Sequence, residues 1–299
     1  MEFEETINSF VEYISIVSEI AKPYNGRLYI GQKLLYRGHS DKKYQLLPSV
    51  ARKKNIPTQV SLLDYERNLI EEAKYRMPSV FRDELQPIDL LAILQHYGIP
   101  TRLLDVTSSP LVALYFACCS HKEYDGEVVI FERIIEDNAI YPINNAIADS
   151  YKLAAKGTSY LSTFYERMLC QSYSSEQITT LNLSYDTSQK GAEWIKNCCD
   201  KIMFVQAKRL AERQLLQQGE YILFPNSIVT DNDCLQFENM INPIDKNSDK
   251  IYGRIYISSS AKEEIIKELN TFGINKGTLF ADSIETVCGQ IVEDIKKMI

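Results

Sequence analysis

The chain has 299 residues, of which 45% are hydrophobic and 24% are charged, a balance typical of a globular protein with a substantial core rather than of a disordered chain. Its net charge of −7 provides no overall attraction to nucleic acid or to an anionic membrane surface. No apolar run approaches the roughly 18 residues that would span a bilayer, so we expect no membrane-spanning segment. We interpret the short basic stretch Arg52-Lys53-Lys54 as a solvated face rather than a track for phosphates.

The cysteine and histidine content argues against a disulfide framework and against a metal site. The seven cysteines are an odd number, two pairs of them are adjacent (Cys118-Cys119 and Cys198-Cys199), and none has C-x-x-C spacing. This pattern is typical of free thiols in a reducing compartment. The chain has three histidines, and its acidic start lacks the basic region of a signal peptide. We therefore expect a cytoplasmic protein without a bound metal.

The first half of the chain alternates between helical and extended patterns. Pro23 ends the first helical pattern, and Ser61 is placed to cap the second. Pro87 lies in the first turn of the third, which ends at Gly98. In chain order the predicted elements are a helix within residues 1–22, an extended segment at 27–38, helices at 61–77 and 87–98, a strand at 102–106, a helix from 110 and a strand at 126–133.

The second half begins with a polar region and then returns to regular patterns. Residues 136–200 are rich in Tyr, Ser and Asn without strong periodicity, and we expect short helices and loops there, as an insertion or as a substrate-facing subregion. Near the end, Ser260 and Glu263 have the spacing of a capping box, and Gly273 ends the helix. In chain order the later elements are a strand at 201–207, a helix at 208–218, strands at 220–225 and 253–258, and a helix at 260–273.

These elements favour an α+β fold, a mixed, mostly antiparallel sheet with flanking helices, because the strands and helices lack regular βαβ spacing. Neither a G-x-G-x-x-G nor a Walker A sequence is present, which argues against Rossmann and P-loop folds. We expect a helix at 1–25, a main domain at 26–285 that contains the polar subregion, and a C-terminal helix at 286–299.

The first candidate functional element is an arginine at the end of an apolar run, in the stretch LLYRGHS of residues 34–40. The planar guanidinium of Arg37 suits a phosphate or a carboxylate, and Gly38 lets a ligand or another backbone come close. An ion pair with a neighbouring carboxylate at a turn explains the same residues. Arg37 is thus a candidate anion-binding residue with a structural alternative.

The second candidate element is a cluster of hydroxyls before a predicted helix, in the stretch DVTSSP of residues 105–110. Thr107 and Ser108 add side-chain donors to the free N–H groups at the positive end of the helix dipole, a place that can bind an anion. Capping alone is the alternative, because Ser109 before Pro110 is a good N-cap without any ligand.

The third candidate element opens an apolar strand, in the stretch QQGEYILFP of residues 217–225. A carboxylate from Glu220 and an amide from Gln218, side by side in a cleft, can hold a ribose hydroxyl and stabilise an oxocarbenium-like centre. The alternative is a glutamate in water at the edge of a strand.

The segment HYGIPTR, residues 96–102, lies between the first and the second candidate elements in the sequence. His96 near a helix C-terminus can be a structural histidine stabilised by the helix dipole, or it can line a nucleotide cleft beside Asp105. Arg102 and Asp105 lie three residues apart on an extended segment, so their side chains need not pair with each other. If both charges are buried, each needs a partner, and a pocket is where partners would be.

The order of the three elements resembles the arginine–serine–glutamate class of ADP-ribosyltransferases. That class has Y-R-G, then S-T-S before a helix, then E/Q-x-E before an apolar strand, and here the stretches are YRG, TSS and QGE. The resemblance implies that Arg37 contacts the pyrophosphate of NAD and that Thr107 and Ser108 lie near the nicotinamide ribose. It also implies that Glu220 grips the ribose hydroxyl and assists the departure of nicotinamide, while Gln218 faces the acceptor.

Longer stretches are similar to the FRG domain family, which is named for a Phe/Tyr-Arg-Gly signature. They are LLYRGHSDKKYQLLPSVAR, LAILQHYGIPTRLLDVTSSPLVALYFAC, ERQLLQQGEY and IYISSSAKEEIIKELNTFGI, within residues 30–280. The family's late motif, Arg…Gln-x-Gly-x-Phe, does not require an acidic residue at position 220. On this resemblance Gln217, or a carboxylate such as Asp105, is the alternative polar centre. Family members occur among bacterial mobile-element and phage-defence genes.

Together the resemblances imply an NAD-dependent ADP-ribosyltransferase with an ADP-ribosyltransferase-like fold, a bacterial toxin or phage-defence effector that modifies a protein or nucleic-acid acceptor. The alternative is a non-catalytic, nucleotide-sensing FRG module that regulates a partner defence or antitoxin protein. A nuclease has little support, because no carboxylates have the spacing of a metal cluster. The candidate catalytic residues are Glu220, Gln218 and Gln217, and the candidate nucleotide-binding residues are Arg37, Gly38, His96, Arg102, Asp105, Thr107 and Ser108.

Overall fold

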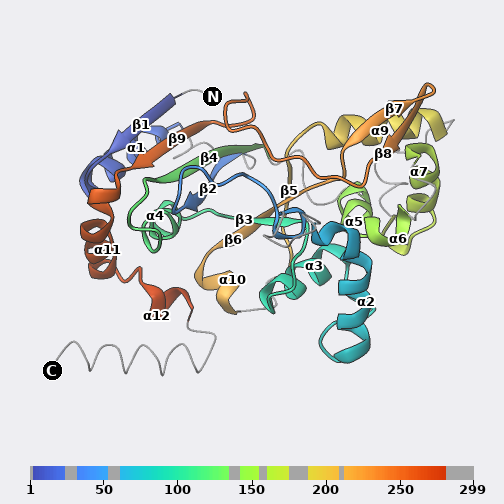
Figure 1. Ribbon diagram of the computed structural model, residues 1–299, viewed down its shortest axis with the longest axis horizontal. Coiled ribbons are helices and arrows are strands. Elements are labelled where there is room, and N and C mark those ends of the chain that lie inside the picture. The colour runs from blue at the N-terminus through green and yellow to red at the C-terminus, as the bar shows by residue number, and fades with distance from the viewer. Residues whose placement is uncertain are drawn as a thin grey trace.

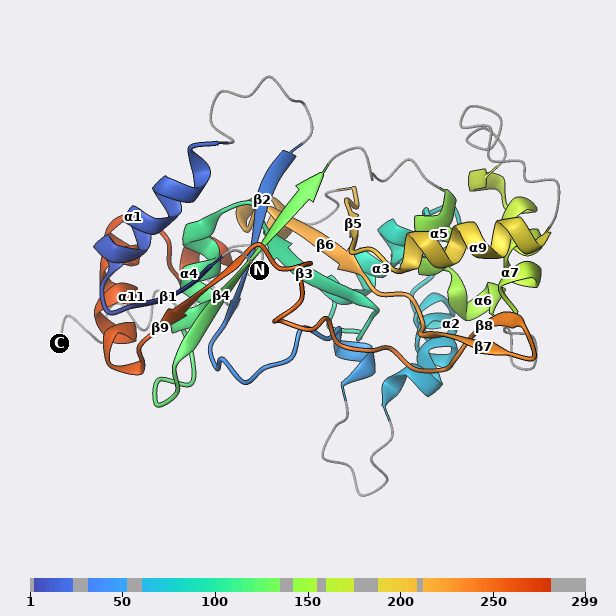
Figure 2. The ribbon, with the colours of Figure 1, turned by 90° about the horizontal axis from the view of Figure 1, so that it is seen from above.

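A seven-stranded sheet runs through the centre of the molecule in the computed structural model, with helices gathered at both of its ends (Figures 1 and 2). The structure describes residues 3–23, 32–52, 61–134, 142–154, 160–174, 188–208 and 212–280. The predicted C-terminal helix at 286–299, the start of the extended segment at 27–31 and parts of the polar region at 136–200 lie outside these residues.

The sheet has the strand order β1-β9-β4-β2-β3-β6-β5. Strand β1 pairs in parallel with β9, and each of the other neighbouring pairs is antiparallel. The strands are β1 Phe3–Ile7, β2 Gln32–His39, β3 Leu103–Thr107, β4 Gly126–Ile134, β5 Met203–Val205, β6 Gly219–Leu223 and β9 Gly253–Ile257. The prediction of an α+β fold with a mixed, mostly antiparallel sheet is therefore confirmed.

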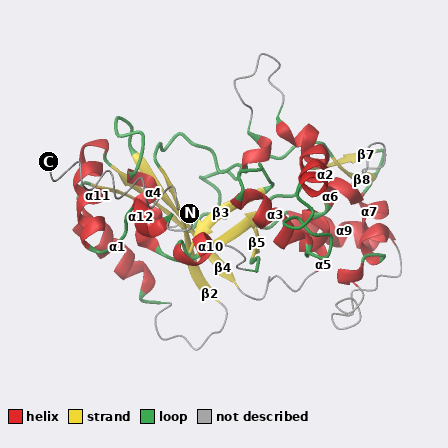
Figure 3. Ribbon diagram, turned by 90° about the horizontal axis from the view of Figure 1, so that it is seen from below, coloured by secondary structure: helices red, strands yellow, loops and turns green. Residues whose placement is uncertain are grey.

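The helices form two groups, and Figure 3 shows the strands running between them. The first group covers one end of the sheet and consists of α1 Phe10–Ala21, α4 Pro110–Cys118 and α11 Lys262–Thr271, followed by α12 Lys276–Leu279. The second group is at the other end and consists of α2 Glu66–Arg76, α3 Pro87–His96, α5 Pro142–Ala148, α6 Ser150–Leu153, α7 Leu161–Leu169 and α9 Ser188–Cys199. The short helix α10 Glu212–Leu216 lies between them, and the 3₁₀ turns are η1 Ser49–Ala51, η2 Leu62–Tyr65 and η4 Ser259–Ala261.

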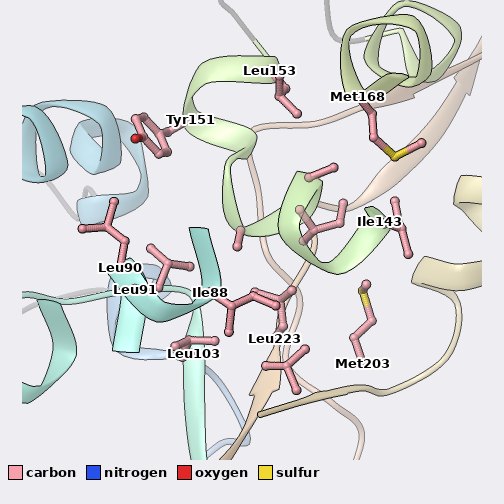
Figure 4. Packing of buried hydrophobic residues seen from close by; sticks show 14 of the residues in the cluster. Ile88, Leu90, Leu91, Leu103, Ile143, Tyr151, Leu153, Met168, Met203 and Leu223 are labelled. Carbon is pink, nitrogen blue, oxygen red and sulfur yellow. The ribbon is translucent and has the colours of Figure 1, made fainter. Parts of the chain in front are cut away.

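Three buried hydrophobic clusters hold these layers together. Alternate residues of a strand point to opposite faces of a sheet, so Tyr36 of β2 packs with the first helix group while Leu35 packs on the opposite face. The second helix group packs on β3, β5 and β6, and Figure 4 shows Ile88 of α3 close to Leu103 and Leu223. Burial of this apolar area is the main force that stabilises the fold.

Several predicted elements are confirmed by the structure. The helix predicted at 87–98 is α3, and Gly98 ends it with a φ of 84°, in the left-handed region that glycine adopts without strain. Ser109 caps α4 as predicted, because its hydroxyl accepts a hydrogen bond from the N–H of Val112. Gly273 likewise follows α11 with a φ of 75°.

Other predictions about local structure were wrong. Residues 3–7 form strand β1 rather than the start of a helix, because they pair with β9, about 250 positions later in the chain. The capping box of Ser260 and Glu263 does not form: the Ser260 hydroxyl bonds to that of Ser258, and Glu263 pairs with Lys122. The sequence reading also missed a hairpin of β7 Ile228–Asp231 and β8 Cys234–Phe237, which packs against the second helix group. The Ser61 side chain makes no capping hydrogen bond.

The feature that shapes the site is a divergence of two neighbouring strands. Strand β2 pairs with β4 over eight residues but with β3 at a single position, Tyr36 opposite Thr107. Past this point α4 packs directly on Gly38, where an added Cβ atom would lie 1.9 Å from the carbonyl oxygen of Ala113. The glycine of the YRG motif is therefore required for the close approach of a helix backbone, and Arg37 lies where β2 and β3 separate.

Candidate functional site

Two cavities meet at Arg37. The large cavity, of about 1120 Å³, lies among the end of β2, η1, the C-terminal end of α4 and residues 239–243. The small cavity, of about 330 Å³, lies among the end of α3, β3, the start of β6, α4 and α10. Arg37, Gly38 and Phe116 line both. The side chain of Arg37 can therefore be reached from either cavity.

Arg37 is held at this junction by two hydrogen bonds. Its Nε donates to Nε2 of His39 over 2.9 Å, and its Nη1 donates to the backbone carbonyl of Asp105, across the gap between β2 and β3. No carboxylate among the described residues forms an ion pair with Arg37. Burial lowers the pKa of Arg37 to about 10, although the charge of Asp105 opposes the shift. Arg37 thus stays charged at neutral pH, beside two cavities, without a carboxylate partner in the described chain.

A buried charged cluster lies behind Arg37 on the same face of the sheet. His39 is 4% exposed, and its Nδ1 is 2.9 Å from a carboxylate oxygen of Glu127, which is fully buried. Glu127 also forms ion pairs with Lys246 and Arg254. Burial lowers the pKa of His39 to about 4, more than its hydrogen bond to Glu127 raises it. His39 is therefore neutral at physiological pH.

A second arginine, Arg52, lines the large cavity. Its Nε donates to the carbonyl of Leu47 over 3.0 Å, and no carboxylate of the described residues pairs with it. Its charge contributes to lowering the pKa of Arg37, after the larger effect of burial, and both arginines line the large cavity. The sequence analysis assigned Arg52 to a solvated basic stretch, although Arg52 is also the last residue of the FRG-like stretch LLYRGHSDKKYQLLPSVAR, which ends before Lys53.

The small cavity has a polar lining that includes one acidic side chain. The Oδ1 of Asp105 accepts a hydrogen bond from Nε2 of Gln95 over 2.8 Å, and Gln95 in turn accepts one from the Thr101 hydroxyl over 2.7 Å. Beside Asp105, on the neighbouring strand β6, the hydroxyl of Tyr221 accepts a hydrogen bond from Nε2 of Gln214 over 2.8 Å. Carboxylate and amide groups of this kind can bind the hydroxyls of a sugar or a carboxamide.

The TSS and QQG motifs lie side by side. The hydroxyl of Thr107 donates to the carbonyl of Gln217 over 2.7 Å and accepts from the N–H of Ser109 over 3.0 Å. The Ser108 hydroxyl donates to the Gln218 side-chain oxygen over 3.3 Å. These hydroxyls therefore tie β3 to the turn before β6, and both motif hydroxyls already have protein partners.

Glu220 lines neither cavity. Residues alternate in β6, so Tyr221 faces the small cavity while Glu220 points to the other face of the sheet. There its carboxylate is 4% exposed and forms ion pairs with Lys33 and Arg133. The predicted arrangement of Glu220 and Gln218 side by side in one cleft is not what the structure shows.

Arg102 also lies away from the cavities. Its guanidinium is fully buried, with Nε 2.8 Å from one oxygen of Glu66 and Nη2 bonded to the other, and Nη1 donates to the carbonyl of Phe224. This pair joins α2 to β3 and the end of β6. The small cavity brings together six of the ten candidate residues, namely Arg37, Gly38, His96, Asp105, Thr107 and Gln217.

Two further searches concerned metal ligands and membrane-spanning helices. Within the described ranges, no group of three or more His, Cys, Asp or Glu side chains is placed to hold a metal ion. Among the same residues, no helix has the length and apolar character needed to cross a membrane.

A comparison with protein-family models matches residues 32–126 to the FRG domain. The matched segment contains the YRG motif, α3, β3 and α4, and thus Arg37 and the α3 and β3 walls of the small cavity. The FRG resemblance is therefore supported over this segment, and the late QQG motif lies beyond it. Searches of curated proteins and of solved structures found no match. None of the comparisons shows a relation to ADP-ribosyltransferases.

Proposed function

We propose that the protein binds a nucleotide at the junction of the two cavities, with Arg37 as the phosphate anchor. The observation that carries the proposal is that Arg37 is charged, half-buried and exposed to both cavities, yet has no carboxylate partner among the described residues. A guanidinium in this setting offers its remaining N–H groups to a phosphate in strong, charge-assisted hydrogen bonds.

The cavities support a dinucleotide such as NAD rather than a mononucleotide. Their volumes of about 1120 and 330 Å³ compare with the ~300–1,000 Å³ of usual ligand sites. Arg37 and Arg52 both line the large cavity, so a diphosphate there would meet two positive charges. The amides and the carboxylate of Asp105 in the small cavity suit the sugar or the carboxamide at the other end of the ligand.

We propose further that the site senses the nucleotide and regulates a partner protein instead of consuming the ligand. Glu220, the carboxylate that the ADP-ribosyltransferase resemblance would use, is buried, lines neither cavity, and has its charge neutralised by Lys33 and Arg133. A buried carboxylate that already has two cationic partners is not presented to a ligand in either cavity.

A second candidate function, NAD-dependent ADP-ribosyl transfer to a protein or nucleic-acid acceptor, is favoured by one observation. Asp105 presents an exposed carboxylate to the small cavity, next to Arg37, and its partner among the described side chains is the amide of Gln95. In an enzyme, Asp105 would take the place of Glu220 and stabilise the oxocarbenium-like ribose as nicotinamide departs.

Binding and turnover are tested with the same proteins. Thermal shift and isothermal titration with NAD, ADP-ribose and ATP should show stabilisation that grows with concentration in the wild type. Arg37→Ala should weaken binding at least tenfold, whereas Arg76→Ala, which removes an exposed arginine of α2, should leave it unchanged. If no nucleotide binds, or if Arg37→Ala binds as the wild type does, the proposal fails.

Chromatography of the NAD samples separates the two candidate functions. Intact NAD in the presence of cell lysate supports sensing. Release of nicotinamide that is abolished by Asp105→Asn but kept in Glu220→Gln supports transfer with Asp105. Release abolished by Glu220→Gln, in a protein that still melts cooperatively, would restore the role that the ADP-ribosyltransferase resemblance gives to Glu220.

A further inference from the structure

His39 stands directly behind Arg37, two residues further along β2 and on the same face of the sheet. Both of its ring nitrogens are engaged. Nε2 lies 2.9 Å from Nε of Arg37, and Nδ1 lies 2.9 Å from an oxygen of Glu127. The ring is 4% exposed and lines the large cavity. A buried histidine with both nitrogens occupied has a defined orientation.

The partners of His39 fix its tautomer. The Nε of a guanidinium carries a hydrogen and cannot accept one, so Nε2 of His39 must be the acceptor. The proton of the neutral ring therefore sits on Nδ1, from which it is donated to the Glu127 carboxylate. An ionised carboxylate has no proton to donate and acts only as a hydrogen-bond acceptor. The ion pairs with Lys246 and Arg254 keep Glu127 ionised. The hydrogen bonds from Glu127 through His39 to Arg37 form one consistent chain.

We propose that His39 is a positioning residue for Arg37, and that Glu127 keeps His39 in the tautomer that this role requires; the inference rests on the proposed binding of a nucleotide at Arg37. Nε of Arg37 donates to His39 and Nη1 donates to the carbonyl of Asp105. These two hydrogen bonds use two of the five guanidinium N–H groups, fix the orientation of the group, and leave the other three N–H groups for a ligand. A guanidinium held in this way loses less conformational freedom when the ligand binds, and affinity rises accordingly.

As a positioning residue, His39 is expected to affect nucleotide binding through Arg37 and not through a contact of its own with the ligand. Removal of the acceptor with His39→Leu should weaken binding of ADP-ribose roughly tenfold, the loss of one hydrogen bond to a charged group. His39→Gln should stay within about threefold of the wild type, because its amide oxygen can take the place of Nε2. The affinity of Glu127→Gln for ADP-ribose should lie between those of His39→Leu and His39→Gln.

A double-mutant cycle by isothermal titration with ADP-ribose provides the test. In an Arg37→Met background, His39→Leu should cause no further loss of affinity, because the group that it positions is gone. The matched control is His121→Leu: this histidine bonds Ser40 and Tyr44 near the large cavity and does not touch Arg37, so binding should not change. Equal losses from His39→Leu in both backgrounds, or no loss in the wild-type background, would overturn the inference.

A measurement without ligand separates this inference from the proposed function. The chain has three histidines, so ¹⁵N NMR of the imidazole nitrogens, assigned with His39→Gln, can identify the protonated nitrogen of His39. A neutral ring protonated on Nδ1 at pH 7 supports the hydrogen-bond chain even if ADP-ribose does not bind. A ring protonated on Nε2, or an imidazolium, would overturn it even if ADP-ribose binds at Arg37.

Discussion

Arg37 lies in β2 and Arg102 lies immediately before the neighbouring strand β3, and the two arginines have different surroundings. Arg102 is fully buried and has a carboxylate, Glu66, in contact with two of its nitrogens. Arg37 is bonded to a neutral imidazole and a backbone carbonyl, and no described carboxylate pairs with it. Arg102 therefore has a structural role, and Arg37 retains a charge that a ligand can neutralise.

The two candidate carboxylates show the same contrast. Glu220 is paired with two cations inside the protein, whereas Asp105 accepts a hydrogen bond from a neutral amide at the wall of the small cavity. In both comparisons the structural group is buried with a protein counter-ion, and the candidate binding group is more exposed and has none among the described residues.

The largest effect is expected from breaking the Arg102 pair. Glu66→Ala leaves a buried charge without a partner, and the free energy of unfolding should fall by about 3–5 kcal/mol. The double variant Glu66→Leu/Arg102→Met should recover most of that loss, because neither charge then remains. Urea denaturation measures both. A loss below 1 kcal/mol for Glu66→Ala would mean that the pair is not the structural contact described above.

Acidification should destabilise the protein through His39. The pKa of His39 is about 4 in the folded protein and near 6.5 when unfolded, so between these values the unfolded state binds the additional proton. The contribution to stability is complete above pH 6.5 and is lost as the pH falls towards 4, with a total of about 3 kcal/mol. Arg37, Glu127 and Lys246 are the charged groups that face the ring.

The pH effect is measured by urea denaturation of the wild type and His39→Gln at pH 7 and pH 5. The wild type should lose roughly 2 kcal/mol more than the variant between these values. An equal loss in both proteins would contradict the buried, neutral state of His39.

Gly38→Ala should destabilise the protein without removing any charge. The new methyl group would overlap the carbonyl of Ala113, so α4 must move away from β2, at a cost of about 1–3 kcal/mol. Because Gly38 lies beside Arg37, nucleotide binding should weaken as well. Gly219→Ala is a matched control, since its nearest neighbour would be 3.7 Å away. Thermal unfolding of both variants makes the comparison, and equal stabilities would count against the tight packing of α4 on β2.

The smallest effect on stability is expected from Arg37→Met. This substitution removes a partly buried charge that has no carboxylate partner, so the free energy of unfolding should change by less than about 1 kcal/mol. Arg102→Met, by contrast, leaves Glu66 unpaired and should cost about 3 kcal/mol or more. If the two substitutions are equally destabilising in urea denaturation, the contrast between the two arginines is wrong.

The parts of the site that the sequence could predict are those fixed by local chemistry. Ser109 before Pro110 specifies a helix start, and Gly98 specifies a helix end, without reference to the rest of the chain. The YRG motif and the FRG match identify Arg37 in the same way.

The parts that could not be predicted depend on which face of the sheet each strand residue points to, and on contacts between residues that are far apart in the sequence. A shift of one residue decides whether a side chain in β6 faces the small cavity or the opposite side, and Glu220 falls on the opposite side. His39 and Glu127 are 88 positions apart, and they meet because β2 pairs with β4. Strand β1 likewise exists only through its pairing with β9.

The most direct test of the central claim is a crystal structure of the protein with bound ADP-ribose. The diphosphate should lie within hydrogen-bond distance of the Arg37 guanidinium, with Arg52 on the side of the large cavity and one ribose directed toward Asp105. Density for the ligand elsewhere, or none at Arg37 at a concentration that saturates the protein in solution, would contradict the account.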